Sequence, residues 1–138
     1  MDYNDIQMVD NMSEDTIGQS KEDYLEAILM ISRSNKICRI TDIARLLSIS
    51  KPSVSVAVQK LENEGFVYRQ ESSILLTESG NKIASRMLER HDVFSSWLCS
   101  IGIDEEVADS EACEMEHIFS NESFRKIAEF IRNNPSKQ

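Results

Sequence analysis

The sequence predicts a mainly α-helical protein with one short β-hairpin. Apolar residues recur three or four positions apart in six segments between residues 21 and 131, which is the period of a helix that buries one face. Two short β-like runs, at 66–68 and 74–76, lie between the third and the fourth of these segments. No apolar run approaches the roughly 20 residues of a membrane span, and 138 residues suffice for one domain or two small helical ones.

The first 17 residues are polar and acidic, and the first helix follows them. Residues 1–17 show no sustained period, so we expect a disordered acidic tail there. Ser20 is expected to cap a helix over residues 21–34, and Asp23 fits the same capping arrangement. The apolar positions from Leu25 onward form a helical stripe that we expect to be buried.

Two further helices are expected close together. Residues 41–47 form a short apolar-striped helix, and the break at 48–50 ends it. Ser50 is expected to cap the next helix, which tolerates Pro52 in its first turn and ends at Gly65.

The polar residues 69–73 between the two β-like runs predict a hairpin tip. Three helices are expected after the hairpin, with a break at Gly102. They run from Thr77 to about Cys99, from a cap at Asp104 to about Phe119, and from about Asn121 to Ile131.

The net charge of −9 at first argues against a nucleic-acid partner. The distribution of charge along the chain does not argue against such a partner. Residues 1–29 hold one basic and eight acidic residues, residues 30–90 hold ten basic and six acidic, and residues 91–138 hold four basic and ten acidic. The middle of the chain is therefore suited to phosphate and its flanks to cations, although a solvated acidic surface would give the same composition.

Two features indicate a cytoplasmic protein. The three cysteines lack paired spacing, which fits a reducing compartment better than a disulfide framework. The acidic N-terminal residues are also unlike a signal peptide, which would be basic and then apolar.

A short helix, a tight break and a second helix followed by a hairpin predict a winged helix-turn-helix. In that geometry the second helix enters the DNA major groove by its N-terminal residues. Small hydroxyl residues there can approach base edges or phosphates, and lysine supplies charge. The alternative is an ordinary helical hairpin whose serines are caps and surface. The expected DNA contacts are Ser50, Lys51, Pro52, Ser53, Ser55, Gln59, Lys60 and Arg69.

Residues that can ligate a metal lie on either side of this segment in the sequence. Cys113, Glu116 and His117 are spaced i, i+3 and i+4, which on a helix puts a thiol, a carboxylate and an imidazole on one face. Asp23 and Glu26 form an acidic pair with i, i+3 spacing in the first helix. Such donors make a transition-metal ligand set, so the sequence suggests a metal-sensing transcription factor.

These motifs together resemble a known family. The segments are Glu22–Ile28 (EDYLEAI), Ile40–Val67 (ITDIARLLSISKPSVSVAVQKLENEGFV), Leu75–Gly80 (LLTESG) and Glu111–His117 (EACEMEH). They are similar to the metal-dependent repressors typified by the diphtheria toxin repressor and the manganese transport regulator, in the short form without an SH3-like domain. The resemblance covers about residues 20–132. It implies a winged-helix DNA-binding domain over 18–77 and a helical dimerisation and metal-binding domain over 78–138.

The resemblance also implies a ligand set, with donors on three helices. The iron-type members carry two further ligands where Ser95 and Asp109 stand here, so their ancillary site is altered. The oxygen donors suit manganese and the softer Cys113 suits iron, cobalt or zinc; we expect manganese, with iron next. The implied ligands are Asp23, Glu26, His91, Cys113, Glu116 and His117.

Each of these residues taken alone has an ordinary interpretation. Asp23 could complete a helix cap, Glu26 could be solvated, His91 could be a satisfied or exposed histidine, and Cys113 could be a small core residue. Their joint occurrence at the matched positions favours metal binding.

The expected mechanism is co-repression. An ion bridging the helices would fix the angle between the two units, and so the spacing of two recognition helices in a homodimer on a palindromic operator. Trp97, Phe119, Phe124 and Ile127 are expected to form the dimer surface or, alternatively, core. A rival is a regulator that senses oxidation through Cys113. A metalloenzyme is disfavoured because no further catalytic signature accompanies the ligands.

Overall fold

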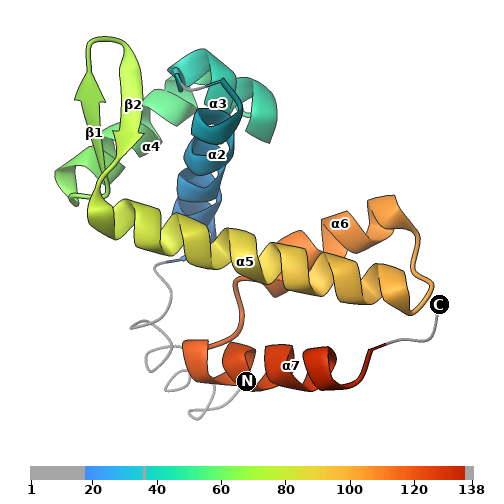
Figure 1. Ribbon diagram of the computed structural model, residues 1–138. Coiled ribbons are helices and arrows are strands. Elements are labelled where there is room, and N and C mark those ends of the chain that lie inside the picture. Colours follow the sequence, from blue (N-terminus) through green and yellow to red (C-terminus); the bar gives the residue numbers. More distant parts are fainter. Residues whose placement is uncertain (1–17, 36, 136–138) are drawn as a thin grey trace, which may run out of the picture. The chain divides into compact units, whose positions relative to one another are not determined.

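The computed structural model describes residues 18–35 and 37–135; the expected tail at residues 1–17 lies outside the described residues. The described chain is mainly helical with a two-stranded antiparallel sheet (Figure 1). It divides into two compact units, one of Gln19–Arg86 and one from Met87 onward, and each is described by itself. The elements are α2 (Gln19–Asn35), α3 (Ile40–Leu47), α4 (Lys51–Asn63), β1 (Val67–Gln70), β2 (Ser73–Leu76), α5 (Glu78–Ser100), α6 (Glu105–Met115) and α7 (Asn121–Asn133).

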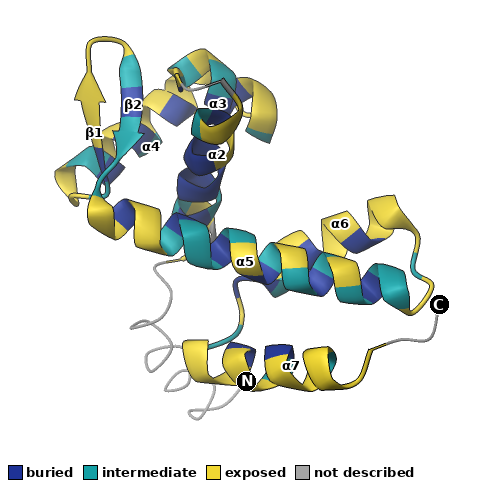
Figure 2. Cartoon of the chain, in the orientation of Figure 1, coloured by how far each residue is buried: buried dark blue, intermediate teal, exposed yellow. Residues whose placement is uncertain are grey.

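The N-terminal unit is built around α2. Figure 2 shows α2 buried along most of its visible length, as expected for a helix enclosed by α3, α4 and β2. In α4 the buried residues Val54, Val58 and Leu61 follow the i, i+4, i+7 spacing that predicted this helix. The backbone N–H of Ile74 donates to the carbonyl of Cys38 over 2.8 Å and so ties β2 to the chain before α3. The unit is a helix-turn-helix with a wing, as expected.

The turn between α3 and α4 has the expected chemistry. Ser48 adopts a left-handed conformation with φ 56°, which ends α3. Ser50 then caps α4, because its side chain accepts a hydrogen bond from the backbone N–H of Ser53 at 3.3 Å.

Two local expectations in this unit are wrong. Ser20 does not precede α2 but lies within it, because Gly18, with φ 106°, leaves the helical region just before Gln19. Asp23 therefore lies beyond the first turn and is not part of a cap. The wing is also longer than expected. Antiparallel pairing continues through Arg69↔Ile74 and Gln70↔Ser73, because exposed polar side chains do not interrupt a backbone ladder.

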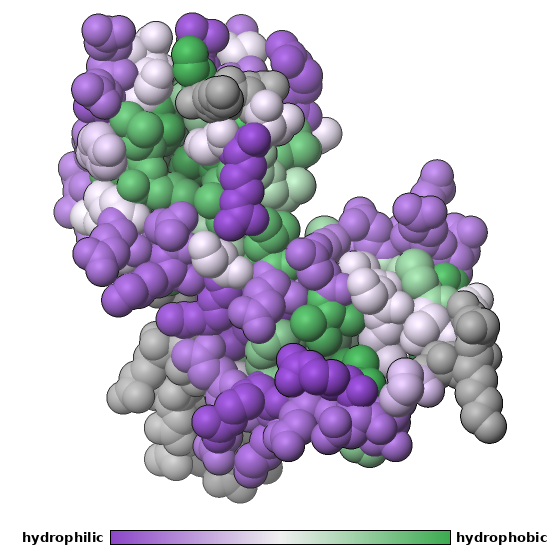
Figure 3. Space-filling view, in the orientation of Figure 1, coloured by the Kyte–Doolittle hydropathy of each residue, from purple (hydrophilic) through white to green (hydrophobic). Residues whose placement is uncertain are grey.

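The C-terminal unit packs α5, α6 and α7 around an aromatic core. Phe94, Ala112, Phe124 and Ala128 form its buried cluster. The Phe94 ring lies 5.6 Å from that of Phe124 in an edge-to-face arrangement. Phe124 is therefore core rather than dimer surface, which decides between the two roles left open for it. The part of α7 seen in Figure 3 presents mostly hydrophilic side chains.

The end of α6 differs from the expectation. The helix stops at Met115 instead of continuing to Phe119. Arg90 of α5, which is fully buried, binds the segment that follows this end. Its Nη1 donates to the carbonyl of Glu116 at 3.0 Å and to that of Phe119 at 2.6 Å, and its Nη2 donates to Asn121 Oδ1 at 2.8 Å. These bonds satisfy two backbone carbonyls of the segment between α6 and α7 and tie that segment to α5.

Among the described residues, no helix is both long enough and apolar enough to cross a membrane.

Candidate metal centre and nucleic-acid interface

Two imidazoles of the C-terminal unit, those of His91 and His117, lie against one buried carboxylate. Glu116 follows the last residue of α6 and is completely buried. Its Oε2 lies 3.2 Å from His91 Nδ1 and its Oε1 lies 3.3 Å from His117 Nε2. Cys113 Sγ lies 3.6 Å from the same His91 nitrogen. The helix thus ends between Cys113 and Glu116, and His91 of α5 lies beside both the thiol and the carboxylate.

The environment of the Glu116 carboxylate fits a bound cation. Neither of its oxygens has a hydrogen-bond partner of acceptable geometry within the described part of the chain, although two imidazoles approach them. A buried carboxylate without such partners is costly. A divalent ion would satisfy both oxygens, and imidazole, carboxylate and thiolate are the donors that such an ion takes. The residues present therefore fit a metal.

His91 is held between two acids. Its Nε2 lies 2.8 Å from Asp109 Oδ1, and its Nδ1 faces Glu116. The contact with Glu116 and then that with Asp109 raise the pKa of His91 to about 9, against the lowering effect of burial. An ion that binds a ring nitrogen of His91 must displace any proton held there. From the sequence, Asp109 was noted only as a departure from the iron type. Its effect on the pKa of His91 depends on the packing of α6 against α5, which the sequence does not reveal.

The two acidic residues of α2 belong to the other unit. Glu26 is buried and Asp23 is half-buried. Their i, i+3 spacing inside a regular helix puts both on one face of α2. Because Asp23 does not cap the helix, its ordinary interpretation loses support.

The expected DNA-contact residues all lie on the surface. α4 and the residue before it expose Lys51 and four small or hydroxyl side chains around its N-terminus. Gln59 donates to Asn63 Oδ1 at 3.1 Å, and Arg69 of the wing lies 3.5 Å from Glu62 Oε1. The complete exposed set is Ser50, Lys51, Pro52, Ser53, Ser55, Gln59, Lys60 and Arg69.

Two residues in these sites escaped sequence reasoning. Val56 is 58% exposed on α4, but as an apolar residue it was not among the expected DNA contacts. Arg90 supports the chain that carries Glu116. Its signal was visible, because a charged residue stands in helical register with the apolar Met87 and Phe94.

Family models match both units of the chain. The model described as the iron dependent repressor, N-terminal DNA binding domain, matches residues 16–73. The model for the iron dependent repressor, metal binding and dimerisation domain, matches residues 77–137. The chain belongs to the iron dependent repressor family. The resemblance and the fold class expected from the sequence are confirmed.

Individual relatives agree with this assignment. The HTH-type transcriptional regulator MntR of Lysinibacillus sphaericus is 34% identical over 114 residues, which cover 82% of each chain. An HTH-type transcriptional regulator of Methanocaldococcus jannaschii is 36% identical over 118 residues, covering 83% of this chain and 94% of its own.

Solved structures are also similar. The manganese regulator SloR has a TM-score of 0.73 at 28% identity, covering 83% of this chain and 54% of its own. IdeR of T. acidophilum has a TM-score of 0.69 at 29% identity, covering 80% of this chain and 53% of its own. The present chain thus spans about half the length of these two proteins.

This member of the iron dependent repressor family is a metal-dependent, DNA-binding transcriptional repressor that acts as a homodimer on its operator, and it is not an enzyme. The metal-responsive function expected from the sequence is confirmed.

Proposed function

We propose that the repressor takes its co-repressor ion at the Glu116 carboxylate. The observation that carries this proposal is the pair of buried Glu116 oxygens, which lack hydrogen-bond partners within the described chain and lie between two imidazoles. The residues proposed to hold the ion are Asp23, Glu26, His91, Cys113, Glu116 and His117.

Manganese is proposed as the preferred ion, with iron next. Three of the six proposed ligands are carboxylates, which favour a hard ion. The relative SloR is described as a manganese regulator, whereas the matched family is described as iron dependent. Iron is proposed as the next preference because Cys113 supplies one softer thiolate donor.

The ion is proposed to work by selecting a conformation. When bound, it supplies positive charge that offsets the carboxylates and stabilises one arrangement of their helices. Because Asp23 and Glu26 belong to α2 and the other ligands to the C-terminal unit, the proposed ligand set links the recognition helix to the dimer. The eight exposed residues of α4, its cap and the wing are proposed to contact a palindromic operator. Thiol oxidation at Cys113, the alternative signal, gains no support from the relatives.

The domain division and the compartment also remain proposals. We propose a DNA-binding domain over 18–77 and a dimerisation and metal-binding domain over 78–138. We propose the cytoplasm as its compartment, because the three cysteines lack paired spacing, which fits a reducing compartment.

The test compares two distant substitutions with a matched control. His117→Ala and Asp23→Ala should both lose metal-activated operator binding while far-ultraviolet circular dichroism stays unchanged, because each removes one donor. Glu111→Ala removes an exposed carboxylate from α6 and should keep full activation. Operator binding is measured against free Mn²⁺, Fe²⁺, Co²⁺ and Zn²⁺. Full activation of Asp23→Ala would show that Asp23 is not a ligand.

A further inference from the structure

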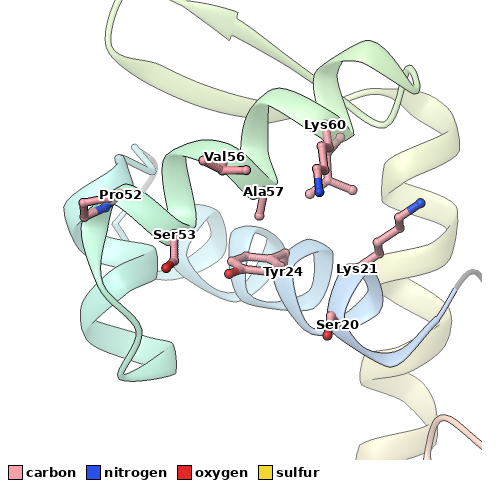
Figure 4. A pocket seen from close by; sticks show the side chains of 9 residues that line it. Ser20, Lys21, Tyr24, Pro52, Ser53, Val56, Ala57 and Lys60 are labelled. Carbon is pink, nitrogen blue, oxygen red and sulfur yellow. The ribbon is translucent and has the colours of Figure 1, made fainter.

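A groove opens between α2 and α4 in the N-terminal unit. Its volume is about 520 Å³. In Figure 4, Tyr24, Val56 and Ala57 lie along its middle, and Lys21 and Lys60 lie together at one end. The groove is therefore apolar along its length and has two lysines at one end.

The groove shares the side of α4 that is expected to contact DNA. Pro52, Ser53 and Lys60 line it and also belong to the DNA-contact set. Lys60 makes no ion pair within the described part of the chain, whereas Lys21 pairs with Glu64 Oε2 at 2.6 Å. Any segment that filled the groove would cover part of α4 and occupy a lysine that DNA needs.

The chain contains a segment whose chemistry matches this groove. Residues 1–17 hold five acidic residues and no lysine or arginine. Within them, Asp5 and Asp10 flank Ile6, Met8 and Val9. An apolar run bracketed by carboxylates is complementary to an apolar groove with lysines at one end.

The attachment point makes the contact accessible. The segment joins the chain at Gly18, next to α2, whose Ser20 and Lys21 already line the groove. The groove follows α4 from Pro52 to Lys60, which at helical rise is about 12 Å. About four extended residues cover that length, and 17 residues can span up to roughly 56 Å. The tether therefore permits the contact without any change in the unit.

We propose that residues 1–17 dock in this groove and compete with DNA for α4. The segment is an intramolecular inhibitor that sets how tightly the repressor binds DNA. A tether confers an effective concentration on the order of millimolar. A weak contact with a dissociation constant of about 0.1–0.3 mM then occupies α4 most of the time, and it weakens DNA binding about four- to ten-fold.

One test locates the segment directly in the full-length protein. A photo-crosslinking p-benzoylphenylalanine replaces Val56, which is exposed and so tolerates the change; the same group at Tyr68, 46% exposed on the wing, is the control. Protein labelled with ¹⁵N is mixed with unlabelled protein, so that mass spectrometry separates links within a chain from links between chains. Crosslinks from position 56, but not 68, to residues 1–17 of the same chain are expected. Links to a second copy, equal yields at both positions or none would overturn the proposal.

A second test measures competition without altering the net charge. Ile6→Ser/Val9→Ser weakens the apolar contact, so its affinity for a mixed-sequence DNA duplex should rise about four- to ten-fold. Met30→Ser changes an exposed apolar residue of α2 that does not line the groove, and its affinity should equal that of the wild type. Fluorescence anisotropy measures both. Equal affinity of the segment variant and wild type would refute the competition, whatever the identity of the co-repressor metal.

Discussion

Replacing Arg90 by methionine should unfold the C-terminal unit at much lower denaturant. Methionine keeps an apolar stem of similar length but donates no hydrogen bond. The carbonyls of Glu116 and Phe119 and the side-chain oxygen of Asn121 all lose their donor. The guanidinium also lies 5.3 Å from the centre of the Phe124 ring, and this cation–π contact disappears with it.

The expected loss is large because the site is fully buried. A hydrogen bond from a charged group contributes about 1.5–3 kcal/mol, and Arg90 makes three of them. Removing a buried charge also relieves its desolvation cost, which offsets part of that sum. Breaking buried charged networks costs about 3–5 kcal/mol, and we expect this loss for Arg90→Met.

The assay is urea unfolding of the metal-free protein followed by circular dichroism. Arg90→Lys keeps the charge but not the planar fork, so its stability should be intermediate. Arg125→Met, on the exposed face of α7, is the matched control and should change the free energy of unfolding by less than about 0.5 kcal/mol. A loss below about 1 kcal/mol for Arg90→Met would refute the claim that this side chain holds the end of α6 in place.

Three other outcomes are expected. Lys51→Glu should weaken operator binding at least about ten-fold at moderate salt, with metal binding and melting temperature unchanged, because it puts a negative charge against the phosphates; unchanged affinity removes α4 from the reading role. Cys113→Glu makes the ligand set harder and should shift activation towards manganese and away from zinc and cobalt; an identical order of metal responses would show that Cys113 is no ligand. Burial and then Asp42 raise the pKa of the Cys38 thiol from 9.0 to about 12, so at pH 8 iodoacetamide should label Cys113 well before Cys38. The raised pKa favours the unfolded thiolate as pH rises from 9 to about 12, so the contribution of Cys38 to stability should be lost across that range, and this pH-dependent loss should be absent in Cys38→Ala.

Where neighbours along the chain supply the cause, the sequence was sufficient. The spacing of Val54, Val58 and Leu61 and the cap at Ser50 predicted α4 because helical period and capping act within a few residues. The same locality predicted the order of helices and hairpin. The start of α2 was expected at Lys21 but lies at Gln19, because the conformation of Gly18 rather than the side chain of Ser20 determines where the helix begins.

Contacts between residues far apart in the chain decided the rest. The segment that follows α6 is held by Arg90, more than twenty positions away in α5. The convergence of His91 and His117 on opposite oxygens of Glu116, and the choice of core for Phe124, likewise depended on how α5, α6 and α7 pack. Residue spacing encodes which side chains share a face of one helix, but it carries no information on which faces meet; burial of apolar surface between helices determines that, and it placed the buried carboxylate between the two imidazoles.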